Sequence, residues 1–213
     1  KNYINYIFFE DYRFNSSKGC ISYFQIDING SRSEPKVVLD KSYHLSYPYI
    51  FEWFGDIYMI PETSENKTVD LYRAVNFPDE WVLEKTLLEN IYAVDTTIFE
   101  YNEKFWMFTC ISSDKSLNQD QMHLFYSDSP AGHWNPHPKN PIVTDVRRAR
   151  PAGKLFYSNG DLIRPAQDCS VRYGYEIVLN KIEVLSENDY REVPINKIRH
   201  SVEKGSICVH TYN

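Results

Sequence analysis

Short apolar runs separated by polar turns recur along the chain. Two similar copies of this pattern occupy residues 47–74 and 95–127. In each copy, an apolar run is followed by a short turn, a second apolar run, a polar loop and a third run. Runs of four to eight residues bounded by Gly, Asn, Asp or Pro are typical of β-strands. The pattern therefore predicts a repeated unit of up to four strands, and no long amphipathic helix.

Further copies extend the repeat in both directions. A third copy begins near Arg150, with strands expected at 154–157, 162–164, 173–179 and 181–185. The earliest copy begins at residue 6 without an opening strand, and residues 207–210 resemble the first strand of another copy.

A repeat of about 50 residues with up to four strands is the unit of a propeller blade, and blades bury their faces against one another around an axis. We therefore predict an all-β, five-bladed β-propeller, with incomplete first and last blades, forming one domain over residues 1–213. A β-sandwich with similar hairpins is the alternative, but the matching turns of three copies disfavour it. The expected blades are residues 1–41, 44–90, 93–142, 149–195 and, in part, 205–213.

In a propeller, the start of each first strand and the end of each second strand open on the same face. Polar side chains at these places are expected to meet at the mouth of the central channel. Those at or near the first-strand starts are His44, Tyr47, Asp95, Arg150 and His210. Those at or near the second-strand ends are Glu10, Glu62, Arg164, Gln167 and Asp168.

Crowded carboxylates suit glycosidic chemistry, in which one carboxyl protonates the leaving oxygen and another activates water or attacks. Asp95, Glu62 and Glu10 are the candidate catalytic residues. The other seven are candidate substrate-binding residues: His44, Tyr47, Arg150, Arg164, Gln167, Asp168 and His210. Structural roles are the alternative, since a carboxylate can cap a loop and an arginine can tie neighbouring blades together.

The composition of the chain limits the kinds of partner that it is expected to bind. The chain is 42% hydrophobic and 15% aromatic, and its net charge of −6 disfavours nucleic acid as a partner. No apolar run approaches the length of a membrane-spanning helix. The four cysteines are widely spaced, which gives no metal site, and no cofactor motif is present. We interpret the four cysteines as thiols of a cytoplasmic protein rather than as two disulfides. The alternative is an exported protein whose signal has been removed.

Several motifs together resemble a known family. They are YHLSYPYIF (43–51), YMIPE (58–62), FPDEW (77–81), VDTTIF (94–99), RPAQDC (164–169) and HTYN (210–213). In this order they resemble the N-terminal propeller domain of glucosamine inositolphosphorylceramide transferases, whose fold is similar to family 43 and family 32 glycoside hydrolases. The resemblance implies a five-bladed propeller, a carbohydrate or glycoconjugate ligand, and a fused or partner transferase domain.

The resemblance also shows departures from the hydrolase pattern. Family 43 enzymes use an Asp in the first blade, an Asp in the second and a Glu in the third. Here the opening strand of the first blade is missing, the second position holds Tyr47 and the third holds Asp95. Two functions stay open: a glycoside hydrolase-like protein acting at the channel mouth, and a non-catalytic domain that recognises a glycan for a glycosyl- or formyltransferase.

Overall fold

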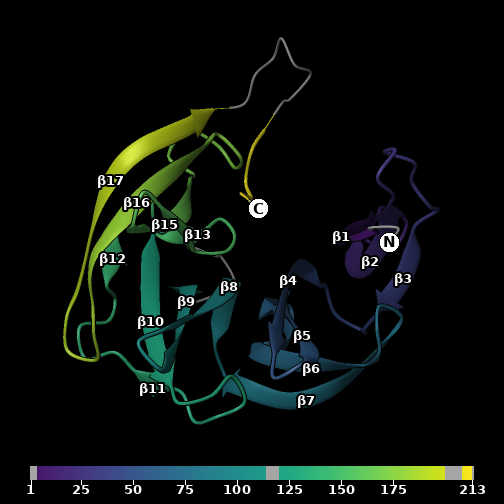
Figure 1. The fold of residues 1–213 in the computed structure, drawn as a ribbon, viewed down its shortest axis with the longest axis horizontal. Helices are drawn as coiled ribbons and strands as arrows, with labels where there is room; N and C mark the ends of the chain where they lie inside the picture. The colour runs from purple at the N-terminus through teal and green to yellow at the C-terminus, as the bar shows by residue number, and fades with distance from the viewer. Residues whose placement is uncertain (1–3, 114–119, 200–207, 213) are drawn as a thin grey trace. The chain divides into compact units, whose positions relative to one another are not determined.

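Antiparallel β-strands dominate the computed structural model, which describes residues 4–113, 120–199 and 208–212. Within these residues the strands form four sheets (Figure 1). The first contains β1 (Asn5–Arg13), β2 (Lys18–Ile26) and β3 (Lys36–Leu39). The second contains β4 (Ser46–Trp53), β5 (Asp56–Thr63), β6 (Thr68–Asn76) and β7 (Glu80–Glu89), with the 3-10 turn η1 (Ser64–Asn66) after β5.

The last two sheets contain shorter strands as well. The third contains β8 (Tyr92–Tyr101), β9 (Lys104–Ser112), β10 (Gln121–Ser127), β11 (Asn135–Pro136) and β12 (Val143–Thr144). The fourth contains β13 (Arg150–Pro151), β14 (Phe156–Ser158), β15 (Asp161–Asp168), β16 (Glu176–Leu185) and β17 (Tyr190–Arg199). The all-β prediction is confirmed, and consecutive strands pair with their neighbours as in blades.

Tight turns set the register of the inner hairpins. The two central residues of each turn have positive φ: Phe54 and Gly55 after β4, Asn102 and Glu103 after β8, and Asn159 and Gly160 after β14. Two-residue turns with this left-handed backbone match the twist of the flanking strands. The turns therefore align the three hairpins in the way that the repeat in the sequence indicated.

The chain divides into two compact units, Lys1–Asn90 and Ile91–Asn213, and each holds two of the sheets. In the first unit, Ile21, Leu39, Leu45, Met59 and Tyr72 form one buried cluster from the first and second sheets. In the second unit, the cluster joins Trp106, Phe108, Met122 and Leu124 to Leu162, Ile182 and Leu185 of the fourth sheet. Each unit thus has a core that its two sheets share. Whether all 213 residues form a single domain stays a prediction.

The outer strands of the fourth sheet differ from the sequence prediction. Strands were expected at 173–179 and 181–185, but β16 runs without interruption through Asn180 and Lys181, and β17 is the fourth strand. Asn180 is buried, and its side-chain amide donates to the carbonyl oxygens of Arg164 and Val178. A polar pair that reads as a turn is therefore accommodated inside the strand, beside a register shift between Leu179 and Asn180.

The predicted fifth blade does not form in the described residues. Residues 208–212 have no strand, and residues 205–207 and 213 lie outside the described part of the chain. Instead, the amide of Val209 donates to Gly174 and the amide of Tyr212 donates to Ala152, at 3.0 and 2.7 Å. The C-terminal segment therefore packs against loops of the fourth sheet.

Candidate carbohydrate site

One position recurs at the same place in the ladders of three sheets. Glu62 pairs with Ser46, Cys110 with Val94, and Gln167 with Arg150. In the second and third sheets the residue after the paired one has left-handed backbone, Tyr47 with φ 41° and Asp95 with φ 51°, and the register shifts there. Such bulges redirect a side chain out of the ladder. The equivalence of Glu62, Cys110 and Gln167 was visible in the sequence repeat.

Asp95 is the centre of a buried polar network in the second unit. Its side chain is buried, with 2% of the residue exposed, and its Oδ2 accepts hydrogen bonds from Arg150 Nε at 2.5 Å and from Gln167 Nε2 at 2.6 Å. The same amide nitrogen of Gln167 donates to the Pro151 carbonyl at 2.9 Å. Charge-assisted bonds of this length fix both partners. The structure therefore brings Asp95, Arg150 and Gln167 together, as the sequence predicted.

The side-chain oxygen of Gln167 is a further hydrogen-bond acceptor in this network. Its Oε1 is buried and has no hydrogen-bond partner among the residues that the structure describes. A buried polar atom without a partner costs about 1–3 kcal/mol, so a water or ligand hydroxyl that donates to it would be stabilised there.

Aromatic side chains extend this network toward solvent. The Arg150 guanidinium lies 5.1 Å from the ring centre of Tyr173, and the His210 ring lies 5.3 Å from the same ring. Tyr173 is 49% exposed and His210 is also exposed. The network thus passes from a rigid buried carboxylate, through an arginine, to an exposed aromatic surface.

Sequence reasoning did not select Tyr173. The sequence pattern placed it at the start of the strand expected at 173–179, but β16 begins at Glu176, and Tyr173 lies in the loop before it, followed by Gly174 with φ 69°.

Two thiols lie close to the same network. Burial raises the pKa of Cys110 to about 12 and that of Cys169 to about 11, while the positive charge of Arg150 acts in the opposite direction on both. All four cysteines carry thiol groups. The two thiols near Arg150 are therefore held protonated and behave as small apolar groups.

Arg164 does not join the Asp95 network. Successive side chains of a strand alternate between faces, so Arg164 and Gln167, three residues apart on β15, project to opposite sides. Arg164 is 1% exposed and binds Glu192 of β17 through two hydrogen bonds of 2.7 Å, with a further bond to the Arg148 carbonyl. This pairing gives Arg164 a structural role, and contact with a substrate stays a prediction.

Asp168 projects to the same side of β15 as Arg164. Its Oδ1 accepts hydrogen bonds from the amide and hydroxyl of Ser170, at 2.9 and 2.5 Å, and its Oδ2 lies 3.5 Å from Lys197 Nζ. Lys197 and Arg199 both bind Glu176, the residue opposite Asp168 in the ladder. Burial raises the pKa of Glu176, but the two cations outweigh it and hold this pKa below its usual range.

The remaining candidates lie in the first unit. His44 Nε2 is 3.3 Å from Glu10 Oε1, while its Nδ1 accepts the Gly19 amide at 2.9 Å, which places the imidazole proton on Nε2. A Cβ on Gly19 would lie 2.4 Å from the Leu45 carbonyl oxygen, so only glycine fits there. Glu10 and His44 therefore join the first sheet to the segment that enters the second.

Glu62 and Tyr47 also lie in the first unit, partly buried near the start of the β4–β5 ladder. The pairing of Glu62 with Asp95 as two catalytic carboxylates joins residues of different units and stays a prediction.

Comparison with known families identifies the chain. The model of the N-terminal region of glucosamine inositolphosphorylceramide transferase 1 matches residues 1–211. The chain belongs to this family. It is 40% identical over 207 residues to glucosamine inositolphosphorylceramide transferase 1 of Arabidopsis thaliana, and 36% identical over 204 residues to that of Oryza sativa subsp. japonica. Each alignment covers 94% of this chain but only 26–27% of the relative, so the chain corresponds to about a quarter of those proteins.

Solved structures show that the fold of this transferase-family domain is an all-β propeller. RS223 β-xylosidase matches with a TM-score of 0.63 at 13% identity, covering 91% of this chain and 71% of the enzyme. A family 117 glycoside hydrolase from Zobellia galactanivorans matches with a TM-score of 0.61 at 14% identity, covering 83% and 55%. At these identities the likeness concerns the fold alone.

The described residues contain neither a metal-binding cluster nor a helix able to cross a membrane. No group of three or more His, Cys, Asp or Glu side chains in this part of the chain is arranged to hold a metal ion. Among the same residues, no helix has the length and apolar character needed to cross a membrane.

Proposed function

We propose that this domain recognises a carbohydrate or glycoconjugate without hydrolysing it, and presents it to a transferase domain. The observation that carries the proposal is the Asp95–Arg150–Gln167 network, which fixes an arginine beneath an exposed tyrosine. An aromatic face packs against the C–H surface of a sugar ring, and an arginine beside it donates hydrogen bonds to ring hydroxyls.

The geometry of Asp95 favours recognition over hydrolysis. A general acid must reach the leaving oxygen of the substrate within hydrogen-bonding distance. The Asp95 side chain is only 3% exposed, and one of its oxygens already accepts two short hydrogen bonds. Asp95 is therefore suited to positioning Arg150 rather than to transferring a proton.

Family membership supports the transferase context. The relatives are named as transferases, and their further length offers room for a domain that carries out the transfer. Their name contains glucosamine and inositolphosphorylceramide, so we propose that the ligand is the sugar-bearing head group of such a glycoconjugate. The cytoplasmic location inferred from the cysteines stays part of this proposal.

A glycan-array screen followed by calorimetry and product analysis tests the proposal. We expect the wild type to bind a glycan and release no product, Arg150→Gln to lose at least about tenfold in affinity, and Asp95→Asn to weaken binding through Arg150. Arg191→Gln is a matched control, because Arg191 is exposed and pairs with Glu183 on the sheet surface. Hydrolysis by the wild type that Asp95→Asn abolishes, with binding retained, would refute the proposal.

A further inference from the structure

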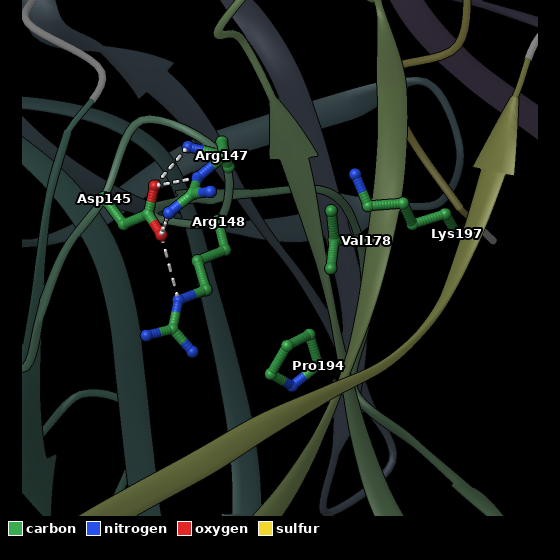
Figure 2. A pocket seen from close by; sticks show the side chains of 6 residues that line it. All are labelled: Asp145, Arg147, Arg148, Val178, Pro194 and Lys197. Carbon is green, nitrogen blue, oxygen red and sulfur yellow. Dashed lines mark hydrogen bonds and ion pairs between the residues drawn. The ribbon is translucent and has the colours of Figure 1, made fainter.

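A cavity with both charged and apolar lining residues lies in the second unit. It has a volume of about 280 Å³ and is lined by Asp145, Arg147, Arg148, Val178, Pro194 and Lys197 (Figure 2). Val178 and Lys197 are ladder partners on β16 and β17, and Pro194 is on β17. The two arginines come from the segment that precedes β13. The cavity therefore has an apolar wall and a rim that contains three cations and one carboxylate.

A tight turn presents the two arginines. The amides of Arg148 and Ala149 both donate to the Asp145 carbonyl oxygen, and the Arg147 amide donates to Asp145 Oδ1 at 3.0 Å. The Arg148 carbonyl is held in turn by Arg164 at 2.8 Å. Because Arg164 is itself fixed by Glu192, the backbone that carries Arg148 is anchored to the buried part of the sheet.

Arg148 is the least tightly held of the three cations. Arg147 binds both oxygens of Asp145, at 2.8 and 3.0 Å, and Lys197 binds Glu176. By contrast, Arg148 lies 3.5 Å from Asp145 and 4.0 Å from Glu192, both longer than a hydrogen bond. Figure 2 shows the Arg148 side chain joined to Asp145 by a single dashed line, with the rest of its guanidinium extending beyond that contact. Among the described residues, both ion pairs of Arg148 are thus longer than a hydrogen bond, and its guanidinium can donate to a ligand in the cavity that it lines.

The charges around the cavity leave one positive charge in excess. The lining cations and the cations that share their carboxylates are Arg147, Arg148, Lys197, Arg164 and Arg199. The carboxylates that face them are Asp145, Glu192, Glu176 and Asp168. Among the described residues this makes five cations against four anions, an excess that a monoanion would balance.

The cavity opens at the same end of the fourth sheet as the Asp95 network. Arg148 is two residues before Arg150, and Lys197 contacts Asp168, the neighbour of Gln167. Gln167 and Asp168 project to opposite sides of β15, so the two places lie on either side of one strand end.

We propose that this cavity is a subsite for a ring-sized ligand carrying a single negative charge on an oxyanion, a phosphodiester or a uronate carboxylate. Arg148 donates to the oxyanion, Lys197 adds long-range attraction, and Val178 and Pro194 contact the C–H face of the ring. The proposal deepens the proposed function, since it rests on that function for the sugar and adds the charge of the group attached to it.

Calorimetry at low salt tests the subsite with four probes: methyl myo-inositol 1-phosphate, methyl glucuronide, neutral myo-inositol and inorganic phosphate. We expect Arg148→Gln to weaken the two charged ring probes by about tenfold or more, and to leave myo-inositol unchanged. Asp145→Asn removes the competing carboxylate and should tighten the charged probes. Arg191→Gln, on the same strand as Lys197 but outside the cavity, should change nothing. The charged probe that binds more tightly shows whether the negative charge of the ligand belongs to a phosphodiester or to a carboxylate.

Two results would overturn the subsite. One is an Arg148→Gln variant that is folded by circular dichroism and binds the charged probes like Arg191→Gln. The other is inorganic phosphate that binds as tightly as the ring probes, which would show an adventitious ion only. Neutral glycan binding that Arg150→Gln abolishes would support the proposed function even then, and the two failures are therefore distinguishable.

Discussion

The buried pair of Arg164 and Glu192 offers a sharp test of how the fourth sheet is held together. Glu192 is 3% exposed at its side chain and accepts three short hydrogen bonds, two from Arg164 and one of 2.5 Å from the Tyr190 hydroxyl. Glu192→Gln keeps the shape but removes the charge, which leaves a fully buried guanidinium without its counter-ion. Breaking a buried pair in this way costs about 3–5 kcal/mol.

This loss is large compared with the whole stability of a domain. A free energy of unfolding of about 5–15 kcal/mol is usual, so the variant should lose about a fifth of it or more. At about 2–4 °C per kcal/mol for a chain of this size, the melting temperature should fall by about 6–20 °C. Thermal and urea unfolding followed by far-ultraviolet circular dichroism measure both quantities, and Glu183→Gln, which breaks the exposed pair with Arg191, is the control.

A double variant separates the pair from its surroundings. Arg164→Met with Glu192→Leu replaces both charges with apolar groups of similar size, and such replacements are often neutral or stabilising. We therefore expect the double variant to recover most of the loss. The reasoning fails if Glu192→Gln costs less than about 1 kcal/mol, the usual range for an exposed pair.

Three other predictions concern different parts of the molecule. Because the pKa of Glu176 lies below its usual 4.5, its pairing with Lys197 and Arg199 stabilises the fold above pH 4.5, and this stabilisation is lost as pH falls below that value. Glu176→Gln should therefore lower the free energy of unfolding at pH 7 and approach the wild-type value in acid. A difference in stability that does not change with pH would contradict this. Gly19→Ala forces a Cβ against the Leu45 carbonyl and should cost about 1–3 kcal/mol by urea unfolding, whereas a neutral result would mean that the loop relaxes. In the native protein at pH 8, iodoacetamide should alkylate the exposed Cys208 but not Cys110, whose pKa is about 12, and peptide mass spectrometry measures both reactions. Rapid modification of Cys110 would show that its thiol is not buried.

The repeat of strands was predictable because its signals are local. Turns at Phe54–Gly55 and Asn159–Gly160, with apolar runs on either side, define hairpins without any long-range information. The equivalence of Glu62 and Gln167 followed from the same alignment and appears in the ladders. The place of Asp95 near Arg150 and Gln167 then followed from strand direction.

The misses arose where tertiary contacts override local signals. Asn180 reads as a turn residue, yet two buried carbonyl acceptors keep it within β16. Arg164 was grouped with Gln167 by closeness in sequence, whereas strand alternation sends it toward Glu192. No sequence rule identifies Arg148 as a candidate ligand-binding residue, because the availability of its guanidinium depends on the distances to Asp145 and Glu192 that the fold sets.

The ladder position shared by Glu62, Cys110 and Gln167 has a consequence for how such domains diversify. The strands pair through this place in all three sheets, whichever of the three side chains is present. A carboxylate, a thiol and an amide occupy it in successive blades of one chain without disturbing the hairpin. Each of these three blades therefore has a residue position whose chemistry can be exchanged, and a relative with different ligands could arise by replacing these few side chains alone.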